Sequence, residues 1–136
     1  MVKQKKKRKK KTPRQKLEER LWNLCRRYIR LRDGNTCQKC GKRVSGSNSH
    51  TSHVIPKSNG NILKYDDINL KVLCSFCHRR WWHKNPLEAD AWFKWMFPSR
   101  YEYVMEQKGE YLKLTVEYLE EKIDWYEDAI VGLELI

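Results

Sequence analysis

The fold of this chain of 136 residues is decided by the stretch that runs from CQKC at residues 37–40 to CSFCH at residues 74–78. Each end carries two cysteines separated by two residues, a spacing with which a tight turn brings two thiolates to one metal ion. Two such turns complete the tetrahedral ligand set of zinc. A structural Zn²⁺ is therefore predicted at Cys37, Cys40, Cys74 and Cys77. Four unrelated reduced thiols are the alternative, and they do not explain two equal spacings.

Length and composition set the class of protein. The chain is long enough for one domain with a modest core, and no apolar run reaches the roughly 18 residues that span a bilayer. Its beginning, MVKQKKKRKKKTP, has no apolar segment behind the charges, so a secretory signal is not predicted. We expect an intracellular protein without a membrane partner. In a reducing compartment, paired Cys-x-x-Cys motifs bind metal more often than they form disulfides.

The net charge of +12 is unevenly distributed. Residues 1–100 carry 26 Lys and Arg against 7 Asp and Glu, whereas residues 101–136 carry 3 against 10. The basic part predicts a polyanionic partner, with nucleic acid as the first candidate. Residues 1–11 are predicted to be a disordered basic arm, because such a segment cannot bury apolar surface. The arm is either a solubility or localisation tail or a set of phosphate contacts.

Helices are expected on both sides of the cysteine stretch. The first covers residues 12–34, with Thr12 as its cap and Pro13 at its first position. Residues 98–136 are predicted to form a last, long helix with a kink at Gly109. Apolar residues recur in both helices at spacings of four and three, a pattern typical of helix pairs. In the last helix this stripe either packs on the first helix or forms a homodimer; its members are Leu112, Val116, Leu119, Ile123, Tyr126, Ile130 and Leu133.

The core between these helices, residues 35–97, has a mixed pattern. Short strands are predicted over residues 49–55 and 68–73, followed by a short helix over residues 75–83. The fold class is therefore α+β, mostly helical, with a small sheet. Four histidines lie in the core, and a four-thiolate zinc site does not need them: His50, His53, His78 and His83. For His83 a surface or phosphate-contacting role is favoured over that of a ligand, because it lies about 140° around a helix from His78. An imidazole near its ordinary pKa can accept a proton at neutral pH or bind a divalent metal.

The set formed by SHTSHVIP at residues 49–56, Asn69 and CSFCH at residues 74–78 resembles the motif of the HNH nucleases. The likeness covers about residues 30–95 and is greatest to the NinG/Rap group of phage recombination nucleases. It implies a ββα-metal core, in which two strands and a helix surround one divalent metal. By the same resemblance His53 would be the general base, His78 a ligand of a catalytic Mg²⁺ or Mn²⁺, and Asn69 the residue that holds the loop around His53.

One position departs from that motif. Many family members have Asp or His before the general base, where this chain has Ser52, a poor ligand. Residues two apart in a strand share a face, so His50 points the same way as Ser52 and could supply the missing ligand. It could also simply hydrogen-bond a loop. Contacts with DNA phosphates are predicted for basic residues around this region and on the first helix, namely Lys57, Arg79, Arg80, Lys84, Arg27 and Arg30.

The resulting hypothesis is a metal-dependent HNH DNA endonuclease that hydrolyses phosphodiester bonds. The resemblance implies a phage-encoded protein that acts on double-stranded or branched DNA in the host cytoplasm, in recombination, branched-DNA processing or nicking. The alternative is a zinc-stapled nucleic-acid-binding adaptor without catalysis, which Ser52 keeps open. A third hypothesis is a protein-interaction scaffold organised by the last helix.

Overall fold

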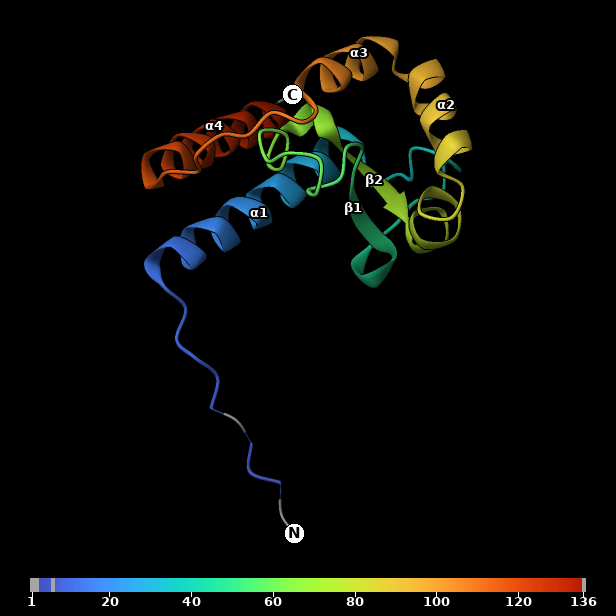
Figure 1. Ribbon diagram of the computed structural model, residues 1–136. Coiled ribbons are helices and arrows are strands. Elements are labelled where there is room, and N and C mark those ends of the chain that lie inside the picture. The colour runs from blue at the N-terminus through green and yellow to red at the C-terminus, as the bar shows by residue number, and fades with distance from the viewer. Residues whose placement is uncertain (1–2, 6, 136) are drawn as a thin grey trace.

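The computed structural model describes residues 3–5 and 7–135, and in them four α-helices surround a two-stranded antiparallel sheet (Figure 1). This confirms the α+β class, with a small sheet, a majority of helix and a long C-terminal helix. A short 3-10 turn precedes each strand, and a short π-helix follows the second strand. The elements in chain order are α1 (Pro13–Arg32), β1 (Ser49–His53), β2 (Leu70–Cys74), α2 (Pro86–Met96), α3 (Pro98–Gln107) and α4 (Val116–Glu134).

Helix α1 begins where its capping residues predict. The hydroxyl of Thr12 accepts a hydrogen bond from the N–H of Gln15, and the Gln15 side chain accepts one from the N–H of Thr12. This reciprocal pair satisfies two backbone donors that the first turn leaves without partners. The residues before the helix that are described, 3–5 and 7–11, are exposed and have no helix or strand (Figure 1). Residues 1, 2 and 6 of the predicted arm lie outside the described residues.

The last helix predicted over residues 98–136 is instead two helices, α3 and α4, and Ile136 lies outside the described residues. Gly109 adopts a φ of +83°, which ends the helical path rather than bending it. Its N–H donates to the carbonyl of Asn59 at 2.8 Å, and the side chain of Asn61 bonds both the N–H and the C=O of Leu112. The connecting segment therefore satisfies its backbone groups on the loop between the strands, which a continuous helix could not do.

Helices α1 and α4 pack side by side and run in the same direction (Figure 1). The ion pairs Arg20–Glu127 and Arg27–Glu134 join residues that are both 107 apart in sequence, as a parallel pair requires. The apolar stripe of α4 is buried at Leu119, Ile123, Tyr126 and Ile130, and the first three belong to the same core cluster as Leu21, Cys25 and Ile29 of α1. At these four positions the stripe packs within the molecule, whereas Leu112 and Val116 are exposed.

The small sheet lies between α1 and α2, and its register runs from Ser49↔Cys74 to His53↔Leu70. The two predicted strands are confirmed, with their ends shifted by one or two residues. Successive side chains point to opposite faces of a strand. His53 stacks on Trp22 of α1, whereas Lys71 of β2 lies over Trp82 and Phe93 on the other face. The two faces are thus covered by different helices.

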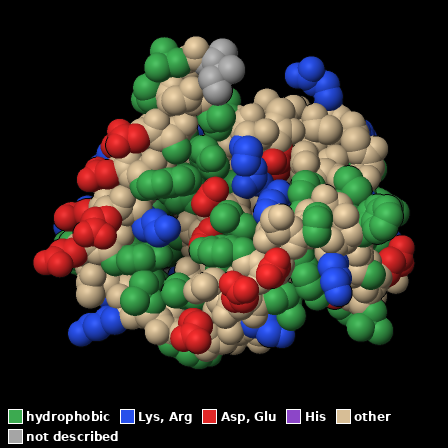
Figure 2. Space-filling view, turned by 90° about the horizontal axis from the view of Figure 1, so that it is seen from above, with side chains coloured by type: hydrophobic (Ala, Val, Ile, Leu, Met, Phe, Trp, Pro, Cys, Tyr) green, Lys and Arg blue, Asp and Glu red, His purple; other side chains and the backbone are tan. Residues whose placement is uncertain are grey.

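The charge of the molecular surface differs from one side to another. Figure 2 looks at the molecule from above, and Asp and Glu side chains gather on its left, over α4. The exposed acidic residues of this helix are Glu117, Glu120, Glu121, Asp124, Asp128 and Glu134. Their negative charge repels the phosphate backbone of a nucleic acid, so this face is unsuited to DNA binding.

Candidate functional site

The four cysteines form one cluster, in which all sulfur atoms lie within 4.8 Å of one another. The Sγ atoms of Cys40 and Cys74 are 3.9 Å apart. Four sulfurs at about 2.3 Å from one zinc ion lie about 3.8 Å from each other, so the donor set fits a tetrahedral Zn²⁺. The N–H of Cys77 also donates to the Sγ of Cys74 at 3.4 Å. The chain therefore contains a four-cysteine site able to bind zinc.

The thiols of the cluster differ in how readily they lose a proton. Burial works to raise the pKa of Cys37, but backbone N–H groups near Cys40 and Cys74 outweigh it and lower the pKa to about 7. Burial, followed by the neighbouring sulfurs, raises the pKa of Cys40 and Cys77. A first thiolate thus forms readily and opposes the ionisation of the others. Binding of a dication would overcome that repulsion and release protons.

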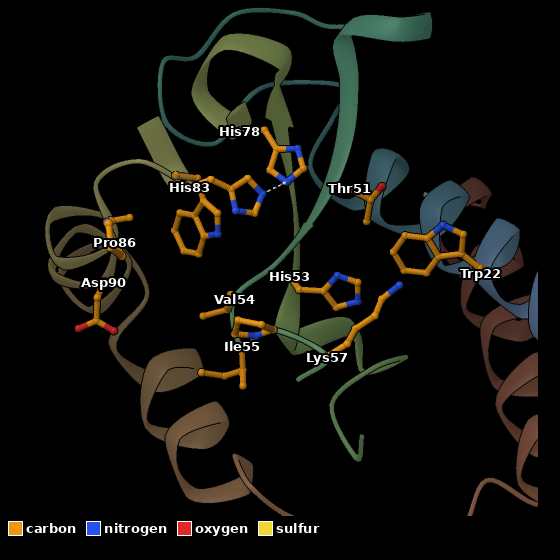
Figure 3. A pocket seen from close by; sticks show the side chains of 13 residues that line it. Trp22, Thr51, His53, Val54, Ile55, Lys57, His78, His83, Pro86 and Asp90 are labelled. Atoms are coloured by element: carbon orange, nitrogen blue, oxygen red, sulfur yellow. Dashed lines mark hydrogen bonds between the residues drawn. The ribbon is translucent and has the colours of Figure 1, made fainter. Parts of the chain in front are cut away.

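The segment after β2 is a π-helix, η3 (Cys77–Trp82), rather than the ordinary helix predicted over residues 75–83. The N–H of His83 bonds the carbonyl of His78, five residues back, at 3.3 Å. In an α-helix these two side chains would be about 140° apart. The wider turn instead places their Nε2 atoms 3.0 Å from each other, and Figure 3 shows the two rings facing one another. His83 is exposed, as expected, and is also a hydrogen-bond partner of His78.

His50 lies behind His78. Its Nε2 is 3.0 Å from the carbonyl oxygen of Ser47, which can only accept, so we assign the proton of His50 to Nε2. The bare Nδ1 of His50 then accepts from Nδ1 of His78, at 2.9 Å. His78 is left with a bare Nε2, the atom that faces His83. A metal-binding imidazole commonly donates its other N–H in this way, so the geometry offers His50 an outer, orienting position. Its predicted role as a direct ligand stays a prediction.

Ser52 does not reach the histidines, because its side chain is 1% exposed and accepts a hydrogen bond from Nζ of Lys71 at 3.2 Å. Lys71 is itself fully buried, and its Nζ lies 3.3 Å from the centre of the Trp82 ring. Burial lowers the pKa of this amine well below its ordinary value. The position before the expected base is therefore filled by a serine–lysine contact in the protein interior.

His53 is held on two sides. Its Nε2 donates to the carbonyl of Lys64 at 3.0 Å, which leaves Nδ1 as the atom with a free lone pair. The imidazole also stacks on the indole of Trp22, with ring centres 5.3 Å apart and planes 7° from parallel. Burial, followed by the charge of Lys57, Lys71 and Lys64, lowers its pKa to about 4. His53 is thus neutral, and able to accept a proton, across the physiological range.

Asn69 makes the hydrogen bonds expected of it. Its side chain is fully buried, accepts from the N–H of Ile55 at 2.7 Å and donates to the carbonyls of Ile55 and Leu63 at 3.1 Å each. These bonds tie both ends of the loop between β1 and β2. Because Lys64 follows Leu63 directly, Asn69 also fixes the carbonyl that His53 contacts.

A cavity of about 660 Å³ brings the histidines together between α1 and α2 (Figure 3). Its walls include Trp22, His53, Lys57, His78, Trp82 and His83. The apolar part of the wall comes from the end of β1 and the start of α2. His53, His78 and His83 therefore share one solvent-accessible pocket, with Lys57 at its edge.

The predicted DNA contacts differ in their surroundings. Arg79, Arg80 and Lys84 are exposed and flank the two pocket histidines along the chain. Arg27, by contrast, is paired with Glu134 of α4, which weakens its case as a phosphate contact. Arg30 is half-buried, and burial together with nearby Arg26 lowers its pKa.

Comparison with known proteins identifies the region that carries this pocket. Residues 37–81 match the family model of the HNH endonucleases. The matched part is about a third of the chain; it contains the four cysteines and three of the histidines, while Trp22 and His83 lie outside it. Searches of the curated proteins and of the solved structures found no match. The match supports an HNH domain, whereas the narrower likeness to the NinG/Rap group has no relative to support it.

Three residues near the pocket histidines were not singled out from the sequence as members of the site. His83 was visible as a second histidine, but its spacing of five is unfavourable unless the helix widens. Lys71 could have been noticed as the one charged residue in a strand that is otherwise apolar, LKVLC. Trp22 carries no local signal, because its contact with His53 depends on the packing of α1 against the sheet.

None of the described helices is long and apolar enough to cross a membrane.

Proposed function

We propose that this protein is a metal-dependent HNH endonuclease that hydrolyses phosphodiester bonds of DNA. The proposal is carried by one observation: a neutral His53 with a free Nδ1 shares a pocket with the facing imidazoles of His78 and His83. A base and a pair of metal-binding nitrogens in one cleft are what hydrolysis of a phosphodiester requires. The HNH match over residues 37–81 supports the same reaction class.

Each residue of the pocket has a distinct role in this proposal. His78 and His83 would hold a divalent ion, which when bound polarises the phosphate and stabilises the departing oxygen. Nδ1 of His53 accepts the proton of the attacking water, while Nε2 keeps its bond to the carbonyl of Lys64. Lys57, at the pocket edge, contacts a phosphate beside the cleaved bond. His50 keeps Nε2 of His78 unprotonated through the bond between their Nδ1 atoms.

The donor set bears on the identity of the ion. Asp90 lines the same pocket, but among the described residues no carboxylate lies close enough to these imidazoles to form a cluster of three potential ligands. Mg²⁺ demands a near-octahedral set of oxygen ligands and gives up its waters reluctantly, whereas Mn²⁺ binds nitrogen donors as the weakest member of the first-row series. Of the two ions expected from the resemblance, Mn²⁺ is therefore the better fit. The zinc proposed at the cysteines is structural, because four thiolates leave no open position for a substrate.

The biological setting is proposed on the resemblance alone. A phage-encoded nuclease that acts in recombination, in processing of branched DNA or in nicking is consistent with a basic protein of this size. Exposed Arg79, Arg80 and Lys84 supply a grip on the DNA backbone that does not depend on sequence.

Incubation of supercoiled plasmid with the purified protein tests the proposal. Relaxation or cutting is expected with Mn²⁺, less with Mg²⁺, and not with chelator. The variant His53→Ala should lose activity by 10²- to 10⁴-fold, the usual contribution of a general base, and still bind DNA. Tyr111→Ala, at an exposed position of the segment between α3 and α4, is the control. Full activity of His53→Ala would contradict the assignment.

A binding adaptor without catalysis is the second candidate, favoured by the burial of Ser52 beneath Lys71. This contact removes one position from which a ligand is expected. DNA binding without nicking under any of Mg²⁺, Mn²⁺, Co²⁺ or Ni²⁺ would favour the adaptor over the nuclease.

A further inference from the structure

We propose that Trp22 of α1 is a positioning residue for His53, so that the first helix, outside the HNH match, takes part in holding the base. The inference rests on the proposed function, because it assigns Trp22 a role in the reaction attributed to His53. Its starting observation is the nearly parallel stack of the two rings, whose centres are 5.3 Å apart.

Two contacts together determine the orientation of the imidazole. The bond from Nε2 to the carbonyl of Lys64 restrains one edge of the ring but allows the ring to tilt about that bond. The indole of Trp22 lies against the face of the ring with planes 7° apart, and this contact restrains the tilt. Nδ1 is left free for a proton, and its direction is set by both contacts.

Trp22 is itself well placed to act as a fixed surface. It follows Leu21 and lies one turn before Arg26, on a helix whose buried residues are packed against α4 and the sheet. On the loop after β1, Nζ of Lys57 lies 5.5 Å from the centre of the Trp22 ring. Figure 3 shows Trp22, Lys57 and His53 grouped on one side of the pocket, across from His78 and His83. A site residue supported by a rigid element keeps its geometry better than one supported by a loop.

Loss of the indole should therefore affect the chemical step more than substrate binding. Without the stack the imidazole can tilt, and Nδ1 spends less time aimed into the pocket. A displacement of about 1 Å of a catalytic group can reduce the rate by about 100-fold. The Lys64 contact is independent of Trp22, so some activity should remain.

The experiment compares Trp22→Leu and Trp22→Phe with wild type in Mn²⁺-dependent plasmid nicking. Trp22→Leu should lower kcat by about 10- to 100-fold with KM and DNA affinity within about 2-fold of wild type. Trp22→Phe keeps a smaller stacking surface, so its kcat should lie between those of wild type and Trp22→Leu. Trp95→Leu, which removes an exposed tryptophan of α2, is the matched control and should leave kcat unchanged. Zinc content and the thermal midpoint are measured for every variant.

A second readout does not need activity. Nitrogen NMR of the His53 imidazole should show the proton on Nε2 in wild type and in Trp22→Leu, whereas NMR relaxation of the ring carbons should show greater ring motion in Trp22→Leu. A wild type that fails to nick plasmid with every ion overturns the proposed function, and the NMR comparison then decides the inference alone.

Three outcomes overturn the positioning role. The first is an unchanged kcat in Trp22→Leu. The second is a loss that appears in KM and DNA affinity instead of kcat, which would make Trp22 a DNA contact. If Trp22→Leu does not fold, an unchanged kcat in Trp22→Phe is the third.

Discussion

His53 and His78 are kept neutral by the same cause, because burial lowers the pKa of each to about 4. They differ in which nitrogen is free. A carbonyl holds the proton of His53 on Nε2, whereas the bond to His50 holds the proton of His78 on Nδ1. Two identical side chains thus present opposite nitrogens to one pocket. The residue types were readable from the sequence, but the assignment of the nitrogens was not, because it depends on the carbonyls of Ser47 and Lys64.

The neutral state of His53 predicts a pH dependence of stability. An unfolded histidine has a pKa of about 6.5, so the unfolded chain binds more protons than the folded one between about pH 6.5 and 4. The free energy of unfolding should fall with decreasing pH in that window, by up to about 1.4 kcal/mol per pH unit from His53. Urea denaturation at pH 7 and pH 5 should show a smaller pH effect in His53→Gln, with both proteins saturated with zinc. Equal pH effects in the two proteins would contradict this prediction.

The contact between His83 and His78 predicts a change in metal dependence. If both imidazoles bind the catalytic ion, His83→Ala should raise the Mn²⁺ concentration needed for half-maximal nicking by about tenfold or more, and excess Mn²⁺ should restore part of the rate. Lys84→Ala, at the adjacent exposed position, is the control and should leave the Mn²⁺ requirement unchanged. If His83→Ala needs the same Mn²⁺ concentration as wild type, His83 is not a ligand of the ion.

Helices and strands whose residues carry strong local signals were predicted correctly. Thr12 and Pro13 mark the start of α1, and the runs around His53 and Val72 mark the strands. The π-helix was missed because its wide turn leaves no periodicity that separates it from an α-helix. The division between α3 and α4 was missed because Gly109 also suits a kink, and the contact of Asn61 with Leu112 that favours a break is tertiary.

The loop between the strands depends on Asn69, which gives a prediction for this element. Asn69→Ala removes three hydrogen bonds and leaves the N–H and C=O of Ile55 without these partners, while the carbonyl of Leu63 still accepts from the N–H of Asp66. Each buried group left unpaired costs about 1–3 kcal/mol, so we expect a loss of about 2–4 kcal/mol in the free energy of unfolding. Urea denaturation measures it. Asn61→Ala, at a less buried position of the same loop, should cost less, and equal losses would contradict the assignment.

Two apolar clusters stabilise the whole molecule: the larger joins the α1–α4 pair to the sheet, and the smaller contains Leu63, Phe93 and Val104. The α1–α4 pair has an extensive apolar contact, whereas the HNH region has a sheet of only two strands and many polar loops among the described residues. The division of charge was predictable from the sequence, since the acidic face of α4 seen in Figure 2 follows from residues 101–136. The parallel direction of the helices was not, because equal spacing of apolar residues suits either direction.

Removal of zinc should therefore affect stability as well as activity. A structural zinc site can contribute about 10–16 kcal/mol to folding, so a chelator strong enough to extract the ion should lower the thermal midpoint substantially. Cys74→Ser should have the same effect. Cys25→Ser, in a thiol outside the cluster, is the control for loss of a buried cysteine and should keep its zinc. An unchanged thermal midpoint after zinc extraction would contradict the structural role.

The parallel packing of α1 on α4 also bears on the order in which the protein folds as it is synthesised. Arg20 meets Glu127 and Arg27 meets Glu134, so α1 leaves the ribosome long before its partner helix exists. At about 5–20 residues per second, the separation of 107 residues corresponds to a delay of roughly 5–20 s. During that interval the zinc-binding region can already assemble, while Trp22 has no docked helix to hold it in place. Docking of α4 on α1 would thus be the event that fixes Trp22 against His53.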